Sequence, residues 1–263
     1  RGDRHQGWSD YLMYGGLPLV CTMQNADQKV TYLTNLFEET YLKDIINRYQ
    51  LQKNVELGDL ITILASSIGS LTNAYRIEAT FKSVARSKIS INTIYQYIQY
   101  LKEAFIINEA NRYDVKGRHY IGTPMKYYFE DVGLRNARLG FRQVEENHIM
   151  ENVIYNELRV RGFSVDVGVV ETRVKDAEGV ETRKQLEVDF VANLGSKRYY
   201  IQSAFSLGTK EKIMQEQRSL MNIPDSFKKI LVVNHESNPW HTQEGTLVIG
   251  VQQFLLEPNS LEL

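Results

Sequence analysis

Residues 185–205, QLEVDFVANLGSKRYYIQSAF, constrain the fold and the chemistry of this chain more than any other stretch. The pattern predicts two β-strands joined by a short polar turn. In the first strand apolar residues alternate with Glu187 and Asp189, so both carboxylates project from one face. In the second strand Gln202 and Ala204 share a face. An acid on one strand with a polar residue opposite it on the next is how metal-dependent nucleases hold a cation.

A third carboxylate comes from the helix expected at residues 146–163. At 100° per residue, Glu157 falls in the middle of the apolar face of this helix, and Glu151 falls at its edge. A carboxylate that faces a protein core is costly unless it is paired or binds a cation. Glu157 is therefore either a metal ligand or a buried glutamate bonded to an arginine or to the backbone.

A different kind of pattern lies upstream, in residues 76–105. A short helix at about 77–86 is followed by a longer one, for which Ser90 is the expected N-cap. The helical period places one apolar stripe at Ile91, Ile94, Ile98, Leu101 and Phe105. The opposite, polar side carries Asn92, Thr93, Gln96, Gln99 and Tyr100. This arrangement is typical of a helix-turn-helix recognition helix, although an ordinary amphipathic helix gives the same pattern and Glu103 on the polar side would repel phosphate.

The next segment, residues 105–134, predicts two strands with a basic tip at residues 116–118. A basic hairpin directly after a recognition helix is typical of a winged helix. The residues expected to contact phosphate are Arg112, Lys116, Arg118 and Lys126. Such contacts give affinity without sequence information. Residues 82–142 hold eleven basic and five acidic residues, so double-stranded DNA is the predicted ligand. Protein–protein docking remains the alternative.

The chain has 263 residues, enough for more than one domain. The expected organisation is a helical region at residues 1–75, a winged-helix domain at 76–142 and an α/β domain at 143–263. In the last of these the order helix, strands, helix, strand predicts a mixed sheet. The expected fold class is therefore mixed α and α/β. The helices at 29–49 and 55–68 are expected to be packing elements.

Several chemistries are disfavoured by composition. The only cysteine is Cys21, so no intramolecular disulfide can form, which suits a reducing cytoplasm. Five scattered histidines argue against a zinc site. No apolar run approaches the ~18 residues of a membrane span, and the N-terminus lacks a signal-peptide pattern. We expect a cytoplasmic chain with no membrane partner.

Six phrases in this order resemble the C-terminal region of a large family of prokaryotic predicted AAA-type ATPases: YLMYGGLP, INTIYQYIQYLKEAFII, KYYFEDVGLRNA, ENVIYNELRVRGF, LEVDFVA and YYIQSAF. The resemblance covers roughly residues 8–258. It implies a P-loop ATPase domain ahead of this region in the full-length protein, and a restriction-endonuclease-like fold at its end. The chain has no G-x-x-x-x-G-K-[ST] motif, so it carries no ATP site of that kind. We expect a C-terminal fragment or a truncated relative.

The restriction-endonuclease-like superfamily uses a D…(D/E)-x-K signature with an acidic residue on a helix. By this resemblance Asp189 matches the first acid, Gln202 the second position, and Glu157 or Glu151 the helix acid. These side chains are the candidate ligands of a Mg²⁺ ion. Ala204 stands where the signature has its lysine. The substitutes nearest in sequence are Lys210 and Lys212, at the start of the next helix.

Three hypotheses follow for the function. The first is a non-catalytic DNA-binding module whose nuclease-like domain is degenerate and which needs no cofactor of its own. The second is a Mg²⁺- or Mn²⁺-dependent nuclease with a relocated lysine. The third is a protein-interaction module that docks an ATPase domain or an oligomeric partner.

Overall fold

The computed structural model describes residues 3–51, 54–85, 88–142, 144–175, 181–206, 209–235 and 238–263. The fold is mixed α/β, with many helices and one large mixed sheet. The chain divides into two compact units. Unit 1 comprises Arg1–Glu109 and Met125–Asn152, and unit 2 comprises Ala110–Pro124 and Val153–Leu263. Unlike the three regions expected from the sequence, these units are not consecutive stretches of the chain.

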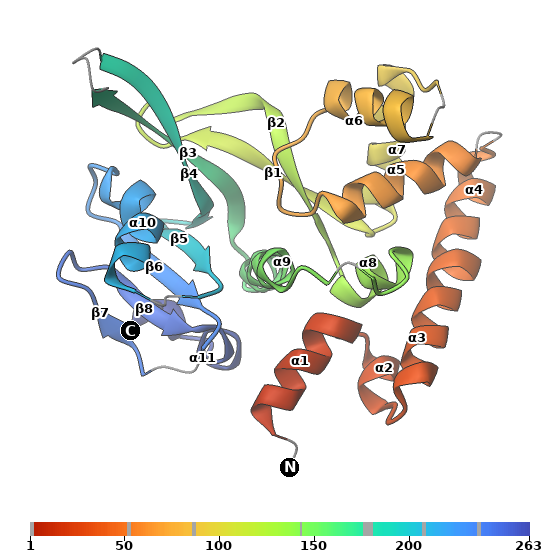
Figure 1. Cartoon of the computed structure of the whole chain (residues 1–263), viewed down its shortest axis with the longest axis horizontal. Helices are drawn as coiled ribbons and strands as arrows, with labels where there is room; N and C mark the ends of the chain where they lie inside the picture. Colours follow the sequence, from red (N-terminus) through yellow and green to blue (C-terminus); the bar gives the residue numbers. More distant parts are fainter. Residues whose placement is uncertain are drawn as a thin grey trace. The chain divides into compact units, whose positions relative to one another are not determined.

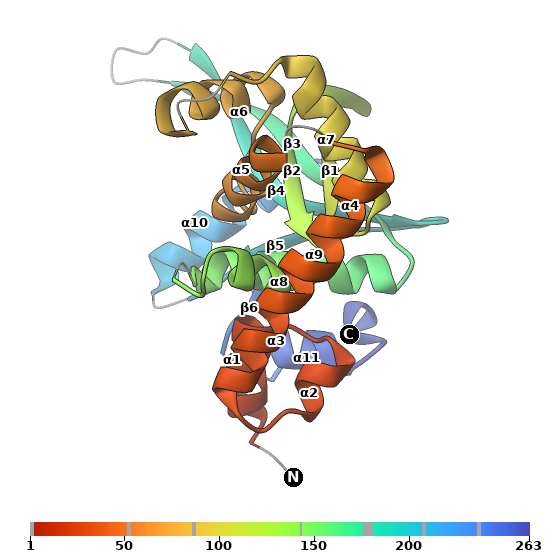
Figure 2. The ribbon, with the colours of Figure 1, turned by 90° about the vertical axis from the view of Figure 1, so that its right-hand side faces the viewer.

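Unit 1 is mainly helical. Its elements are α1 (Arg4–Tyr14), α2 (Pro18–Thr22), α3 (Ala26–Asn35), η1 (Leu36–Leu42), α4 (Lys43–Tyr49), α5 (Asn54–Ser66), α6 (Ala74–Thr80), η2 (Phe81–Ala85), α7 (Ile91–Glu103) and α8 (Val132–Arg138). Figure 2 shows α3, η1 and α4 as one continuous helical rod, which confirms the helix predicted at 29–49. Helix α5 matches the predicted helix at 55–68 closely. None of the described helices is long and apolar enough to cross a membrane.

The buried helix α8 was not predicted, because residues 105–134 were assigned to the strands of a hairpin. Asp131 caps it: Oδ1 accepts a hydrogen bond from the Leu134 amide at 3.0 Å, and Oδ2 accepts one from the Gly16 amide at 2.8 Å. Burial raises the pKa of Asp131, and the hydrogen bonds from the backbone oppose this shift. One carboxylate therefore begins α8 and also joins it to the loop that follows α1.

Two further side chains of α8 satisfy backbone groups of other helices in unit 1. Asn136 Nδ2 donates to the carbonyls of Leu12 and Met13, each at 2.9 Å, in the last turn of α1. Arg135 Nε donates to the Ala65 carbonyl at 2.8 Å, near the end of α5. Carbonyls in the last turn of a helix have no partner within the helix. The segments YLMYGGLP and KYYFEDVGLRNA are therefore held together by hydrogen bonds from α8 to the last turn of α1.

The sheet has the strand order β2-β1-β3-β4-β5-β6-β8-β7. Strand β1 pairs in parallel with β3, β3-β4-β5 are antiparallel, and β5-β6-β8 are parallel. Strands β1 and β2 and helix α9 each have residues in both units. The elements are β1 (Ile107–Asp114), β2 (His119–Phe129), α9 (Glu146–Val160), β3 (Ser164–Lys175), β4 (Glu181–Leu194), β5 (Lys197–Ala204), α10 (Lys210–Met221), β6 (Lys228–Val233), β7 (Trp240–His241), β8 (Leu247–Gly250), α11 (Val251–Leu256) and η3 (Ser260–Glu262).

The predicted strand pair at 185–205 is confirmed as β4 and β5, in the middle of this sheet. Helix α10 packs on these two strands (Figure 1). Leu220 belongs to a buried cluster with Val188, Val191 and Tyr200. Fully burying such an aliphatic side chain contributes about 1.5–3 kcal/mol. The segment directly after β8 forms helix α11.

Candidate functional site

The two strand residues of the predicted metal site lie next to each other. Asp189 on β4 is buried, and its Oδ2 accepts a hydrogen bond from the Ser203 amide at 2.8 Å. The Asp189 amide in turn faces Gln202 Oε1 at 3.4 Å. The pairing of β4 with β5 brings these residues together, as their alternation predicted.

Helix α10 supplies a further polar partner. Ser219 Oγ donates to Gln202 Oε1 at 3.3 Å, so this amide oxygen faces two donors. An amide oxygen has two lone pairs, and a cation at this point would have to displace one of the donors. Nearby on α10, Gln217 is 2% exposed, and its Nε2 has no hydrogen-bond partner among the described residues. The hydrogen bond between Ser219 and Gln202 therefore links the sheet to α10.

Glu157 is hydrogen-bonded to an arginine, which is one of the two arrangements that the sequence predicted for this carboxylate. Its Oε1 accepts a hydrogen bond at 2.7 Å from Nε of Arg161, which directly follows the end of α9. The other guanidinium nitrogens of Arg161 donate to Ser260 Oγ at 2.9 Å and to the Phe254 carbonyl. Glu157 thus orients the arginine that ties α9 to the C-terminal segment of unit 2.

The lysine of the nuclease signature has no counterpart at its expected position. Ala204 is 3% exposed and packs in an apolar cluster with Leu231, Val233 and Val248. Lys212 is exposed on α10, where its charge opposes the burial that raises the pKa of Glu216. The side chain of Lys210 lies outside the described residues. Within the described part of the chain, no three histidine, cysteine, aspartate or glutamate side chains gather as a metal site.

We expect Asp189→Ala to lower the free energy of unfolding by about 1–3 kcal/mol, because the partly buried Ser203 amide loses its acceptor. Chemical denaturation measures this loss. The control is Glu181→Ala, which removes an exposed carboxylate from the same strand and should cost less than about 1 kcal/mol. Equal losses in the two variants would show that Asp189 has no structural role.

Helix α7 has the polar and apolar faces that its period predicts. Ile94, Tyr97, Ile98 and Leu101 are buried, and Ser90 caps the helix by accepting a hydrogen bond from the Thr93 amide at 3.1 Å. The residues exposed on the polar face include Asn92, Gln96 and Gln99, whereas Thr93 is half-buried. The expected stripe was wrong at Phe105. This residue lies beyond the helix end with φ 53° and is 75% exposed.

Tyr49 of α4 contacts the C-terminal half of this polar face. The Tyr49 ring stacks on the Tyr100 ring with centroids 3.6 Å apart. The Tyr49 hydroxyl donates to Glu103, and this hydrogen bond lowers the pKa of that carboxyl. Gln99 Nε2 donates to the other Glu103 oxygen at 2.9 Å, and Gln96 Nε2 donates to the Tyr100 hydroxyl at 2.6 Å. Among the residues of the predicted polar face, Asn92 and Thr93 at its N-terminal end make none of these contacts.

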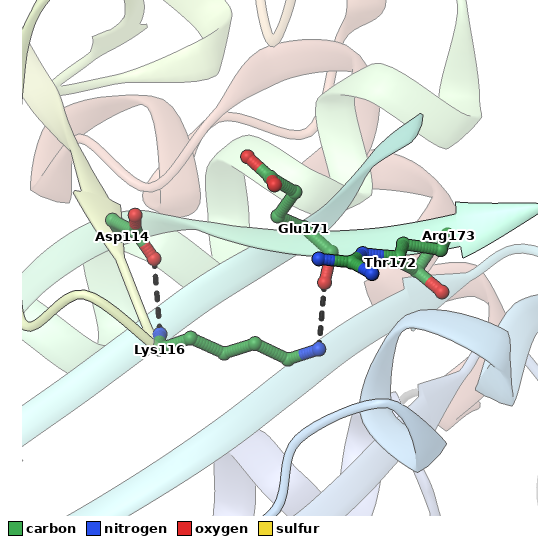
Figure 3. Close-up of a pocket in the computed structure, with 5 residues that line it drawn as sticks. All are labelled: Asp114, Lys116, Glu171, Thr172 and Arg173. Atoms are coloured by element: carbon green, nitrogen blue, oxygen red, sulfur yellow. Dashed lines mark hydrogen bonds between the residues drawn. The ribbon is translucent and has the colours of Figure 1, made fainter. Parts of the chain in front are cut away.

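Two of the four expected wing cations are held by the sheet of unit 2. Lys116 Nζ donates to the Glu171 carbonyl on β3 at 2.6 Å, and Figure 3 shows its side chain reaching across to that backbone. Arg112 Nη2 donates to Gln185 Oε1 on β4 at 2.9 Å. These contacts follow from the parallel pairing of β1 with β3. Arg118, at the turn between β1 and β2, is exposed.

Lys126 was predicted to contact phosphate, and this was wrong. The residue is 2% exposed in unit 1, and its Nζ pairs with Glu151 Oε1 at 2.9 Å. The Tyr128 hydroxyl donates to the same oxygen at 2.7 Å. Strand β2 changes from exposed to buried along its length, and Lys126 lies in its buried part. The same ion pair occupies Glu151, the alternative helix acid.

Sequence reasoning missed a pocket in unit 2. Its lining includes the neighbouring cations Lys197 and Arg198, Arg118, and the aromatic residues Tyr113 and Phe227. The adjacent lysine and arginine were the only signal in the sequence. Tyr113 lies more than eighty positions before Lys197 in the sequence, and Phe227 lies almost thirty positions after Arg198. No local pattern could therefore show that these rings line the same pocket.

Comparison with known proteins gives a family, two relatives and one solved structure. The profile of a family described as "Domain of unknown function (DUF8612)" matches residues 5–145. An uncharacterized protein of Haemophilus influenzae is 32% identical over 250 residues, which are 95% of this chain and 58% of that protein. An uncharacterized protein of Methanocaldococcus jannaschii is 25% identical over 204 residues, which are 78% of this chain and 43% of that protein. The chain thus spans about half the length of these relatives.

A crystal structure of a Vibrio cholerae protein covers 88% of this chain and 54% of its own. The two are 13% identical, with a TM-score of 0.31.

Proposed function

We propose that this chain, which belongs to the family described as "Domain of unknown function (DUF8612)", is the non-catalytic DNA-binding part of a longer protein. In this proposal α6 and α7 act as the helix-turn-helix of the predicted winged helix, with α7 as the recognition helix. The α/β part is a restriction-endonuclease-like domain without its catalytic lysine. A P-loop ATPase domain lies in the remainder of the full-length protein, in keeping with the greater length of the relatives.

The exposed N-terminal half of α7 is the observation that carries this proposal. Recognition helices contact base edges with residues near their N-terminus, and the covering contacts from Tyr49 involve the other end of α7. The exposed amide of Asn92 can bond the edge of an adenine, and the amide of Gln96 can do so if it exchanges its hydrogen bond to the Tyr100 hydroxyl. Residues 74–103 carry five basic and two acidic residues, with Lys82 and Lys88 exposed ahead of α7. This balance favours a polyanionic ligand.

Fluorescence anisotropy with duplex DNA at low salt tests the proposal. We expect Asn92→Ala combined with Gln96→Ala to weaken specific binding about 10- to 100-fold, since a good bidentate pair contributes about 1–3 kcal/mol. Lys82→Ala and Lys88→Ala should each reduce the slope of log affinity against log salt by about 1.

A matched control is Lys43→Ala, which removes an exposed lysine from another helix of the same unit. It should change the affinity by less than about twofold, in line with its distance from α7 in the sequence and its own ion pair with Glu39. The absence of binding at low salt would refute the proposal, as would equal effects of Lys43→Ala and Lys88→Ala.

The non-catalytic part of the proposal is supported by the apolar packing of Ala204 and by the two donors at Gln202 Oε1. Incubation of duplex and single-stranded DNA with Mg²⁺ or Mn²⁺ tests it. We expect no cleavage. Cleavage that disappears both in Asp189→Ala and in Lys212→Ala would establish the nuclease with a relocated lysine instead.

A further inference from the structure

The pocket of unit 2 that sequence reasoning missed has a charge and a shape of its own. Three cations line it, Arg118, Lys197 and Arg198, together with one acid, Asp225, and the rings of Tyr113 and Phe227. These side chains come from the end of β1, the β1–β2 turn, the start of β5 and the loop before β6. The described lining therefore has an excess of positive charge beside aromatic surface.

Arg198 is fixed in orientation at the centre of this group. Its guanidinium carbon lies 5.4 Å from the ring centroid of Tyr113 and 5.4 Å from that of Phe227. Its Nε donates to Asn193 Oδ1 at 2.7 Å. Cation–π contacts on both sides and this hydrogen bond hold the charge in place before any ligand arrives. A preorganised cation loses less conformational entropy on binding.

The carboxylate of Asp225, the one acid of the described lining, already accepts two hydrogen bonds. Asp225 Oδ2 accepts a hydrogen bond from the Tyr200 hydroxyl at 2.6 Å, and Oδ1 accepts one from the Phe227 amide at 3.2 Å. The Arg118 guanidinium has no hydrogen-bond or ion-pair partner within the described ranges. Lys197 and Tyr199 both bond Glu262 from the face of β5 opposite to Arg198. Arg118 is therefore the cation of the lining that is available to an anion.

We propose that this pocket binds a nucleotide, with its phosphate on Arg118 and its base against Phe227. Arginine and lysine bind phosphate oxygens through charge-assisted hydrogen bonds. The Phe227 ring is 41% exposed although Arg198 lies on it, which leaves surface for a base. A base stacked on an aromatic side chain contributes about 1–3 kcal/mol. The nucleotide is either free or the 5′ end of a nucleic-acid strand.

This inference is independent of the proposed function of α7, because its residues lie in unit 2 and those of α7 lie in unit 1. Calorimetric titration of the full chain separates the phosphate from the base. The ligands are adenosine 5′-monophosphate, ribose 5-phosphate and adenosine. We expect the monophosphate to bind at least about fivefold more tightly than ribose 5-phosphate, which corresponds to the lower end of the stacking contribution. Adenosine should bind more weakly than the monophosphate.

Two variants assign the contacts. Arg118→Asn should weaken binding of the monophosphate about tenfold, and asparagine suits this position because its φ is 55°. Phe227→Ala should reduce the affinity for the monophosphate to that for ribose 5-phosphate, and leave the latter unchanged. The control is Arg159→Ala, an exposed arginine of α9 in the same unit outside the lining, which should change neither affinity.

A single-stranded hexanucleotide, with and without a 5′-phosphate, identifies the source of the nucleotide. Tighter binding of the phosphorylated strand that is lost in Arg118→Asn indicates a strand end. Tight binding of the monophosphate with no effect of strand phosphorylation indicates a free nucleotide. The inference is overturned if neither the monophosphate nor the phosphorylated hexanucleotide binds at millimolar concentration. It is also overturned if ribose 5-phosphate binds as tightly as the monophosphate, or if Arg118→Asn leaves the affinity for the monophosphate unchanged. Asn92→Ala with Gln96→Ala should leave monophosphate binding intact, so failure of one proposal is distinguishable from failure of the other.

Discussion

Replacement of Lys126 by methionine is expected to lower the free energy of unfolding by about 3–5 kcal/mol. The methionine keeps much of the volume of the buried side chain but leaves the Glu151 carboxylate without its cation. Breaking a buried ion pair on one side is costly because the remaining charge has lost both water and its partner. The hydrogen bond from Tyr128 remains and does not neutralise the charge. Chemical denaturation followed by circular dichroism measures the loss.

Two further variants distinguish the buried charge from other effects. Lys126→Met combined with Glu151→Gln removes both charges and keeps an acceptor for the Tyr128 hydroxyl, so it should recover a large part of the lost stability. Lys43→Met removes a lysine from an exposed pair with Glu39 and should cost less than about 1 kcal/mol. If Lys126→Met costs no more than Lys43→Met, the ion pair is not a source of stability.

Gly133→Ala is the second substitution with a large expected effect, at least about 3 kcal/mol. A Cβ atom at residue 133 would lie 2.0 Å from the Tyr14 carbonyl oxygen and 2.9 Å from Asp131 Oδ1. The first of these is backbone and cannot rotate away, so α1 and α8 would have to separate. Overpacking a well-packed core costs about 1–3 kcal/mol and occasionally more, and here the separation would also strain the Asn136 bonds to α1. Thermal and chemical denaturation measure the loss.

The same substitution at a second glycine of unit 1 provides the control. Gly7 lies within α1, and a Cβ atom there would meet nothing within 4 Å. Gly7→Ala should therefore stabilise the protein by about 0.5–1 kcal/mol, because alanine is the better helix former. Opposite signs for the two substitutions would confirm that close packing of α8 on α1 requires Gly133. A loss below about 1 kcal/mol for Gly133→Ala would contradict it.

Local patterns were sufficient for the elements that carry the candidate site. Alternation along residues 185–205 gave β4 and β5, and it placed Asp189 beside Gln202. Thr209 directly precedes α10 and caps it, because its side chain accepts a hydrogen bond from the Lys212 amide at 3.3 Å. Each of these features depends on spacing within one segment or between adjacent strands. The helix predicted behind Ser90 is correct for the same reason.

The partners of the polar side chains did not follow from such patterns. Lys126 was read as a wing cation because it is a lysine in a basic hairpin, but its partner is Glu151 on a helix that follows α8. The polar face of α7 was correct, yet the contact from Tyr49 that covers half of it comes from 51 positions earlier in the chain. Helix α8 escaped notice because its seven residues are almost all buried and show no amphipathic period.

The sequence by itself determined the strand pair, the amphipathic α7 and the absence of a lysine at Ala204, because each of these is encoded in local spacing or in residue identity. Only the tertiary structure decided which charges are free. It buried Lys126 against Glu151, tied Lys116 and Arg112 to neighbouring strands, and left Arg118 exposed. The physical reason is that the cost or availability of a charge depends on the groups that surround it after folding, and those groups are distant in sequence.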